Sequence, residues 1–179
     1  TLSNANGKSW EQYMGANASL VGKDNAYGVA LYQTYRNRNP YDDNADGFSE
    51  LGKLNMNTFG LRGYYRPTQS GRLNVEYHTT NEFRRGGNKF SMEPFETDIT
   101  EQTKHIINSG GVSYDQFMGD YKHKLSVFAS AQHVDRNSYY GAQQDSNAYG
   151  KTKDLTWVAG ATYTGNFDKV IFSPAQFTA

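Results

Sequence analysis

Polar and apolar residues alternate along residues 72–80, in the order Arg-Leu-Asn-Val-Glu-Tyr-His-Thr-Thr. A period of two residues is typical of a β-strand, because successive side chains of a strand point to opposite faces of its sheet. One face would carry Leu73, Val75 and Tyr77, whereas the other would carry two charged residues and a histidine. The same pattern recurs along most of the chain, so each copy must place its apolar face against an apolar medium.

The pattern predicts seven strands, at about residues 10–20, 27–36, 54–66, 72–82, 105–116, 122–135 and 155–163. Short connections separate some of these strands, near residues 22–25, 67–71, 118–120 and 165–168. Long polar connections separate the others, at residues 37–52, 83–103 and 136–153. We expect residues 1–8 to form a loop and a further strand to begin near the carboxyl end.

Short and long connections alternate strictly along the chain, which places every long connection at the same end of the sheet. Outer-membrane β-barrels have short periplasmic turns and long extracellular loops. The lengths of the predicted strands also agree with a membrane barrel. A tilted membrane strand needs about 9–11 residues, whereas strands of globular proteins have about 5–6. We therefore expect an all-β fold, namely an antiparallel transmembrane β-barrel segment of about seven to eight long strands, in which residues 1–179 form one partial barrel domain.

The order of the connections also predicts the direction of the chain. The first connection is short and hence periplasmic, which places the amino end on the outer side. Small complete barrels have both ends in the periplasm, so we expect an internal piece of a larger barrel. The alternative is a soluble β-barrel that binds a small ligand in its mouth. A mean hydropathy of −0.81 is compatible with a membrane barrel as well as with a soluble barrel, because lumen-facing polar residues lower the mean hydropathy of a membrane barrel.

The charges balance, with 18 Lys and Arg against 18 Asp and Glu, so no net charge draws the chain to nucleic acid or anionic lipid. Cysteine is absent, which excludes disulfides and thiolate metal sites. The four histidines lack the spacing of metal ligands, and a Ser-His nucleophile pair has no support in the sequence. We therefore expect a protein that is not an enzyme.

An acidic motif, Asp-Asp-Asn-Ala-Asp-Gly-Phe-Ser-Glu, occupies residues 42–50 in the first long connection. It places oxygen ligands at alternate positions and a glycine where the chain must turn sharply, as calcium loops do. The candidate ligands are the side chains of Asp42, Asn44, Asp46 and Glu50 and the carbonyl of Phe48. The motif is no EF-hand, because Lys53 stands at the twelfth position. A solvated acidic turn is the alternative.

Two adjacent arginines, Arg84 and Arg85, open the second long connection. Arginines in such a position would hold an anionic ligand or pair with carboxylates of a plug domain. The alternative is a solvated cluster in which they pair with the acids that follow them in the same connection.

Five segments resemble the TonB-dependent outer-membrane receptors of Bacteroidetes type. They are Asn-Pro-Tyr at 39–41 running into the acidic loop, Phe-Gly-Leu-Arg-Gly-Tyr-Tyr at 59–65, Glu-Phe-Arg-Arg-Gly-Gly at 82–87, Arg-Asn-Ser-Tyr-Tyr-Gly at 136–141 and Ala-Tyr-Gly at 148–150. The resemblance covers nearly all of the chain. It is closest to the receptors for cobalamin (the BtuB-like group) or for ferric siderophores.

This resemblance implies a 22-stranded barrel with an amino-terminal plug on which TonB pulls from the periplasm. The expected function is TonB-dependent active import of a scarce nutrient, cobalamin or a ferric siderophore, across the bacterial outer membrane, although haem receptors share the same pattern. We expect the plug to lie outside residues 1–179. Expected partners are outer-membrane lipid, the small-molecule ligand, the TonB system through the plug and, as in related systems, a surface lipoprotein cap, but no nucleic acid.

The resemblance also assigns roles to residues. The residues expected to face the lumen, and so to contact the plug or line the ligand path, are Arg62, Arg72, Asn74, Glu76 and His78. In the cobalamin transporters calcium orders the extracellular loops, and residues 42–50 would serve in that way here.

Overall fold

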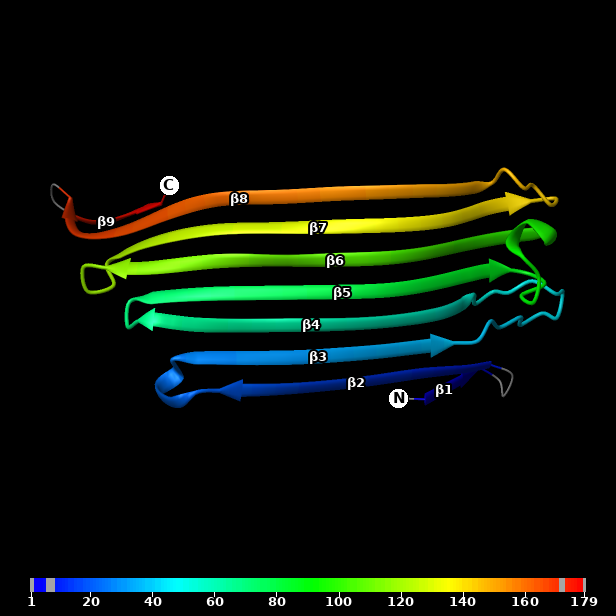
Figure 1. The fold of residues 1–179 in the computed structure, drawn as a ribbon, viewed down its shortest axis with the longest axis horizontal. Helices are drawn as coiled ribbons and strands as arrows, with labels where there is room; N and C mark the ends of the chain where they lie inside the picture. Colours follow the sequence, from blue (N-terminus) through cyan, green and yellow to red (C-terminus); the bar gives the residue numbers. More distant parts are fainter. Residues whose placement is uncertain (1, 6–8, 171–172, 179) are drawn as a thin grey trace.

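A single antiparallel β-sheet makes up the computed structural model, which describes residues 2–5, 9–170 and 173–178 (Figure 1). In this described part nine strands lie side by side in chain order. They are β1 Leu2–Ala5, β2 Ser9–Val21, β3 Tyr27–Arg38, β4 Lys53–Thr68, β5 Gly71–Gly87, β6 Ile99–Met118, β7 His123–Ala142, β8 Tyr149–Val170 and β9 Ser173–Thr178. Two 3₁₀ turns, η1 Lys23–Asn25 and η2 Pro94–Glu96, complete the elements. The predicted all-β antiparallel fold is confirmed.

The sheet is open, with β1 and β9 at opposite edges (Figure 1). Strands β2 to β8 are 12 to 22 residues long. Every strand pairs with the next one along the chain, so each connection is a hairpin. The hairpin joining β6 to β7 places Asp120 and Tyr121 at φ values of 54° and 67°. Positive φ at both central residues is the conformation that suits the twist of antiparallel strands.

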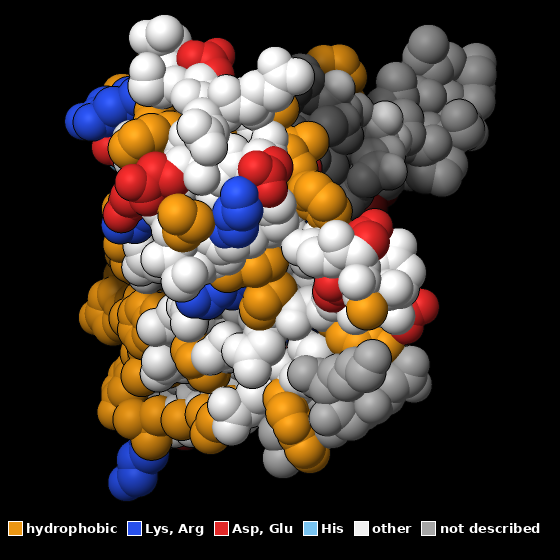
Figure 2. All heavy atoms as spheres, turned by 90° about the vertical axis from the view of Figure 1, so that its right-hand side faces the viewer, with side chains coloured by type: hydrophobic (Ala, Val, Ile, Leu, Met, Phe, Trp, Pro, Cys, Tyr) orange, Lys and Arg blue, Asp and Glu red, His pale blue; other side chains and the backbone are white. Residues whose placement is uncertain are grey.

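The two faces of the sheet differ sharply. In the register, one row across six strands consists of Val29, Gly63, Val75, Val112, Ala129 and Ala159. We call the side that carries this row the apolar face, and the side that carries Arg72, Asn74 and Glu76 the polar face. Figure 2 looks along the strands, and the hydrophobic side chains run along its left-hand side.

Apart from the strand tips beneath the 88–98 loop, the apolar face of the described strands has nothing packed against it. Among the described residues only Tyr41, Leu54 and Tyr139 are buried hydrophobic side chains. In contrast, Trp157 and Leu155 on β8 expose 72% and 69% of their surface. Monomeric soluble proteins rarely expose contiguous apolar patches of more than a few hundred Å². A sheet with this surface requires an apolar partner, whether lipid or further protein.

On the polar face, aromatic rings lie over glycines of the neighbouring strand. Tyr32 on β3 covers Gly60 on β4, and Tyr64 on β4 covers Gly28 on β3. A Cβ atom at either glycine would overlap the ring that covers it. Glycine in the interior of a strand often marks such a close approach of a neighbouring group.

The connections are shorter than the sequence predicts. We call the end with the connections 22–26, 69–70 and 119–122 the turn end, and the end with 39–52, 88–98 and 143–148 the loop end (Figure 1). The connections expected at 83–103 and 136–153 contain more strand than the sequence predicts, because residues 83–87 and 99–103 belong to β5 and β6, and residues 136–142 and 149–153 belong to β7 and β8. Of the three loop-end connections that the structure describes, only 39–52 and 88–98 are long.

Two other predictions at the ends of the chain are wrong. The turn expected at residues 165–168 lies within β8, which continues to Val170. Part of the loop expected at residues 1–8 is strand β1, while residues 1 and 6–8 lie outside the described residues. The further strand expected near the carboxyl end is present as β9.

Candidate functional site

A groove of about 560 Å³ lies on the polar face toward the turn end. Its lining includes Arg62, Arg72, Asn74 and Glu76, which come from the adjacent strands β4 and β5. Arg62 Nη2 lies 3.6 Å from Glu76 Oε2, and Arg72 Nε donates to Asn74 Oδ1 at 2.9 Å. Four of the five residues predicted to face the lumen therefore share one surface. We call this surface the turn-end groove.

His78 extends the polar surface by one row. The hydroxyl of Tyr32 lies 2.6 Å from His78 Nδ1, and Glu76 Oε2 lies 3.8 Å from His78 Nε2. Across the groove, the guanidinium of Arg72 stacks over the ring of Tyr64 at 4.4 Å from the centroid. Hydrogen bonds and stacking hold these side chains in defined positions, as a ligand path or a plug contact requires.

A second hollow of about 540 Å³ lies at the loop end and is lined by Arg38, Glu82, Arg84, His105 and Arg136, among others. We call it the loop-end pocket. Arg84 Nε lies 2.8 Å from Glu82 Oε1, and His105 Nδ1 lies 3.6 Å from the same oxygen. Arg38 donates to the carbonyl of Gly52 at 3.0 Å. The pocket joins strands β3 to β7 to the first long loop, and Glu82 pairs with Arg84 within it.

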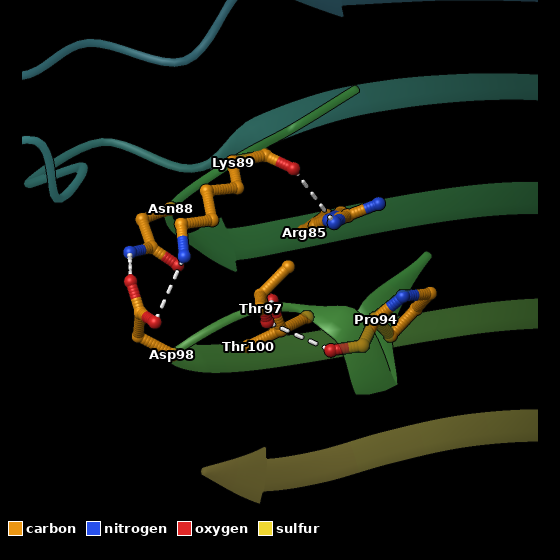
Figure 3. A network of polar contacts seen from close by, with 7 residues as sticks. All are labelled: Arg85, Asn88, Lys89, Pro94, Thr97, Asp98 and Thr100. Carbon is orange, nitrogen blue, oxygen red and sulfur yellow. Dashed lines mark hydrogen bonds and ion pairs between the residues drawn. The ribbon is translucent and has the colours of Figure 1, made fainter. Parts of the chain in front are cut away.

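Arg84 and Arg85 point to opposite faces of the sheet, because adjacent residues of a strand do so. Arg84 lies on the polar face, whereas Arg85 is buried at the tip of β5 beneath the 88–98 loop (Figure 3). Arg85 Nη2 donates to the carbonyl of Met92 at 2.8 Å, and its guanidinium lies 5.7 Å from the centroid of Phe90. The Arg85 side chain thus anchors the 88–98 loop, and both arginines are among the residues that line the loop-end pocket.

The 88–98 loop is held in place by its own polar contacts (Figure 3). Asp98 accepts hydrogen bonds from Asn88 at 2.7 Å and from Lys89 at 2.9 Å. The hydrogen bond from Lys89, then that from Asn88, lowers the pKa of the Asp98 carboxyl below its ordinary value. The Thr97 hydroxyl lies 2.7 Å from that of Thr100, and both residues are buried. The loop is therefore a packed cap on the strand tips.

The acidic loop brings three of its five predicted ligands together. One carboxylate oxygen from each of Asp42, Asp46 and Glu50 lies within 4.8 Å of the other two. Calcium bonds oxygen at about 2.3–2.6 Å, so its ligands stand up to about 5 Å apart, and this group fits the ion. Asn44 instead accepts the amide of Asp46 at 3.0 Å. Phe48, the fifth predicted ligand, donates its amide to Asp46 Oδ1 at 2.8 Å.

Backbone hydrogen bonds shape this loop around the carboxylates. Asp42 accepts the amides of Ala45 at 2.7 Å and Gly47 at 2.8 Å. Gly47 has a φ of 90°, which favours glycine. Ser49 donates its amide to the carbonyl of Gly87 at 3.0 Å, which ties the loop to the tip of β5. The loop thus stands beside the loop-end pocket, and Glu50 contributes to both.

Sequence reasoning missed Arg38, His105 and Arg136, because only the register places them beside Arg84. The hydroxyl of Ser126 on β7 donates to Asp115 Oδ1 at 2.5 Å. Within the described residues the acidic loop is the only group of three His, Cys, Asp or Glu side chains with metal-site spacing, and it contains no histidine. No helix in the described part of the chain is long and apolar enough to cross a membrane.

Comparisons with protein-family models, with curated proteins and with solved structures found no match to this chain.

Proposed function

We propose that this chain forms part of the wall of a TonB-dependent transporter that imports a scarce nutrient, cobalamin or a ferric siderophore, across the bacterial outer membrane. The observation that carries the proposal is the separation of faces on seven strands of 12 to 22 residues in one open sheet. Membrane β-barrels require lipid-facing apolar and lumen-facing polar residues in alternation. A lipid environment explains why the apolar face has no packing partner away from the strand tips.

The polar face would then line the lumen. The turn-end groove offers Arg62, Arg72, Asn74 and Glu76 to a plug domain or to a passing ligand. Such contacts suit transport, because side chains that already pair with one another, as Arg62 does with Glu76, would bind the plug or the ligand only weakly and reversibly. In this account energy comes from TonB acting on the plug, so the wall needs no catalytic group.

The loops at the other end would receive the ligand. The acidic loop and the loop-end pocket share Glu50, and the 88–98 cap stands on the same end of the sheet. Calcium bound by Asp42, Asp46 and Glu50 would cross-link the acidic loop. A loop fixed in this way would present a more constant surface to the ligand.

Nutrient uptake tests the proposed function. Cells that lack the full-length protein should lose high-affinity import of one among cobalamin, ferric siderophores and haem, and should regain it when the gene is restored. A form of the protein with Arg62→Ala and Glu76→Ala should import more slowly while its surface amount stays constant. Unchanged import of all three nutrients in the deletion strain would contradict the proposal.

A further inference from the structure

Among residues 10–167, the charged side chains of the apolar face are confined to one end of it. Between residues 10 and 167 of strands β2 to β8, that face carries five basic residues and one acid. These residues are Lys53, Arg85, Lys104, Asp135, Lys151 and Lys153. All six lie toward the loop end, beyond the band of exposed apolar side chains. The polar face, in contrast, mixes both signs along its whole length.

Three of the lysines gather on neighbouring strands. Lys104 on β6 and Lys151 on β8 both pair in register with Asn137 on β7, and Lys153 lies one row nearer the apolar band. Neighbouring strands are about 4.8 Å apart, so the backbones at Lys104 and Lys151 are about 10 Å apart. Two lysine side chains span that distance easily. We call Lys104, Lys151 and Lys153 the lysine cluster.

The lysine cluster has an excess of positive charge. Lys153 Nζ lies 3.4 Å from Asp135 Oδ2, which is the acidic residue of this face. Lys104 and Lys151 are exposed, and neither forms an ion pair with the described residues. Two neighbouring cations therefore lack a counter-charge on the protein.

The most exposed apolar side chains of the sheet border this cluster. On β8 the outward residues after Lys151 and Lys153 are Leu155 and Trp157, which are 69% and 72% exposed. A molecule that covered both features would need an apolar part against the aromatic and aliphatic side chains and an anionic part against the lysines. A lipid with a phosphate headgroup has both parts in this order, and lysines reach such headgroups with their flexible stems.

We propose that the lysine cluster is a binding site for the phosphate headgroup of an anionic lipid, whose acyl chains lie over Leu155 and Trp157. This inference rests on the membrane placement given under the proposed function. It adds that one position on the barrel wall binds an anionic lipid in preference to other lipids. The lipid would fix the height of β6 to β8 in the bilayer and neutralise the two unpaired lysines.

Trp157 provides the test, because bromine atoms on acyl chains quench tryptophan fluorescence only at contact. The full-length protein is reconstituted in bilayers that contain brominated phosphatidylglycerol or brominated phosphatidylcholine. The signal of Trp157 is obtained by subtracting that of the Trp157→Phe variant. Phosphatidylglycerol should occupy the site about fivefold or more in preference to phosphatidylcholine, because each lysine near a headgroup contributes roughly a fivefold factor.

Variants make the test specific. Lys104→Gln with Lys151→Gln should reduce the preference to nearly equal binding, whereas Lys104→Arg with Lys151→Arg should keep it. Lys23→Gln, in an exposed turn at the other end, is the matched control and should change nothing. Equal quenching of the unmodified protein by the two lipids would overturn the lipid site but leave the membrane placement intact. If neither lipid quenched Trp157, both the site and the membrane placement would fail.

Discussion

At the scale of single residues, the polar face depends on small side chains as much as on charged ones. The ring of Tyr32 lies over Gly60, and its hydroxyl forms a hydrogen bond with His78. His78 Nε2 in turn lies 3.8 Å from Glu76 Oε2. The glycine is needed because the ring occupies the place where a Cβ would be. The position of an aromatic ring on one strand thus requires a particular residue on its neighbour.

Gly60→Ala should therefore destabilise the sheet by about 1–3 kcal/mol, the usual cost of forcing an extra methyl group into a packed site. The free energy of unfolding in urea measures the effect. Gly63→Ala on the same strand is the control, because its new Cβ would come no closer than 3.5 Å to another heavy atom. Adding Tyr32→Ala to Gly60→Ala should recover part of the loss. Equal stabilities of the Gly60 and Gly63 variants would contradict this account.

The 88–98 cap should respond to pH through Asp98. Its pKa is lowered in the folded protein, so its contribution to stability is complete above its ordinary pKa of 3.8 and is lost as the pH falls through the lowered value. Hydrogen exchange of residues 88–98 should be faster in Asp98→Asn than in the unmodified protein at pH 7. The difference should disappear in strong acid. Identical exchange at pH 7 would show that Asp98 does not hold the loop.

At the scale of elements, alternation predicts strands better than it predicts their ends. The predicted strands overlap β2 to β8, but β5 to β8 run several residues further than expected, through segments whose charges suggested loops. Charged residues occur in strands wherever one face is polar, so charge is a poor signal for a strand end. The register determines which side chains lie together. It places His105 and Arg136 beside Arg84, whereas the side chain of Arg85 points to the opposite face of the sheet.

The acidic loop should bind calcium as a unit. Asp46→Asn and Glu50→Gln should each weaken calcium binding by about tenfold or more, because each removes a carboxylate from the group of three. Isothermal titration calorimetry of the full-length protein measures this. Asp24→Asn, in an exposed turn at the opposite end, serves as the control. No binding by the unmodified protein at millimolar calcium would exclude the site.

At the scale of the whole molecule, the charges are sorted by face, although they sum to zero along the sequence. Net charge gave no reason to expect an anionic lipid, yet the fold gathers three lysines beside the most exposed apolar residues. Composition cannot reveal such sorting, because it depends on which residue of each strand faces outward. The same sorting underlies the proposed membrane placement, the proposed lumen and the proposed lipid site.

The membrane placement can be tested along a single strand. The chain has no cysteine, so single cysteines introduced at positions 73 to 78 of β5 can each carry one spin label. In the full-length protein in lipid bilayers, labels at 73, 75 and 77 should collide with oxygen dissolved in the lipid. Labels at 74, 76 and 78 should collide instead with a water-soluble nickel complex. An accessibility without this two-residue period, or labels at 73, 75 and 77 shielded inside protein, would contradict the lipid-facing sheet on which the account depends.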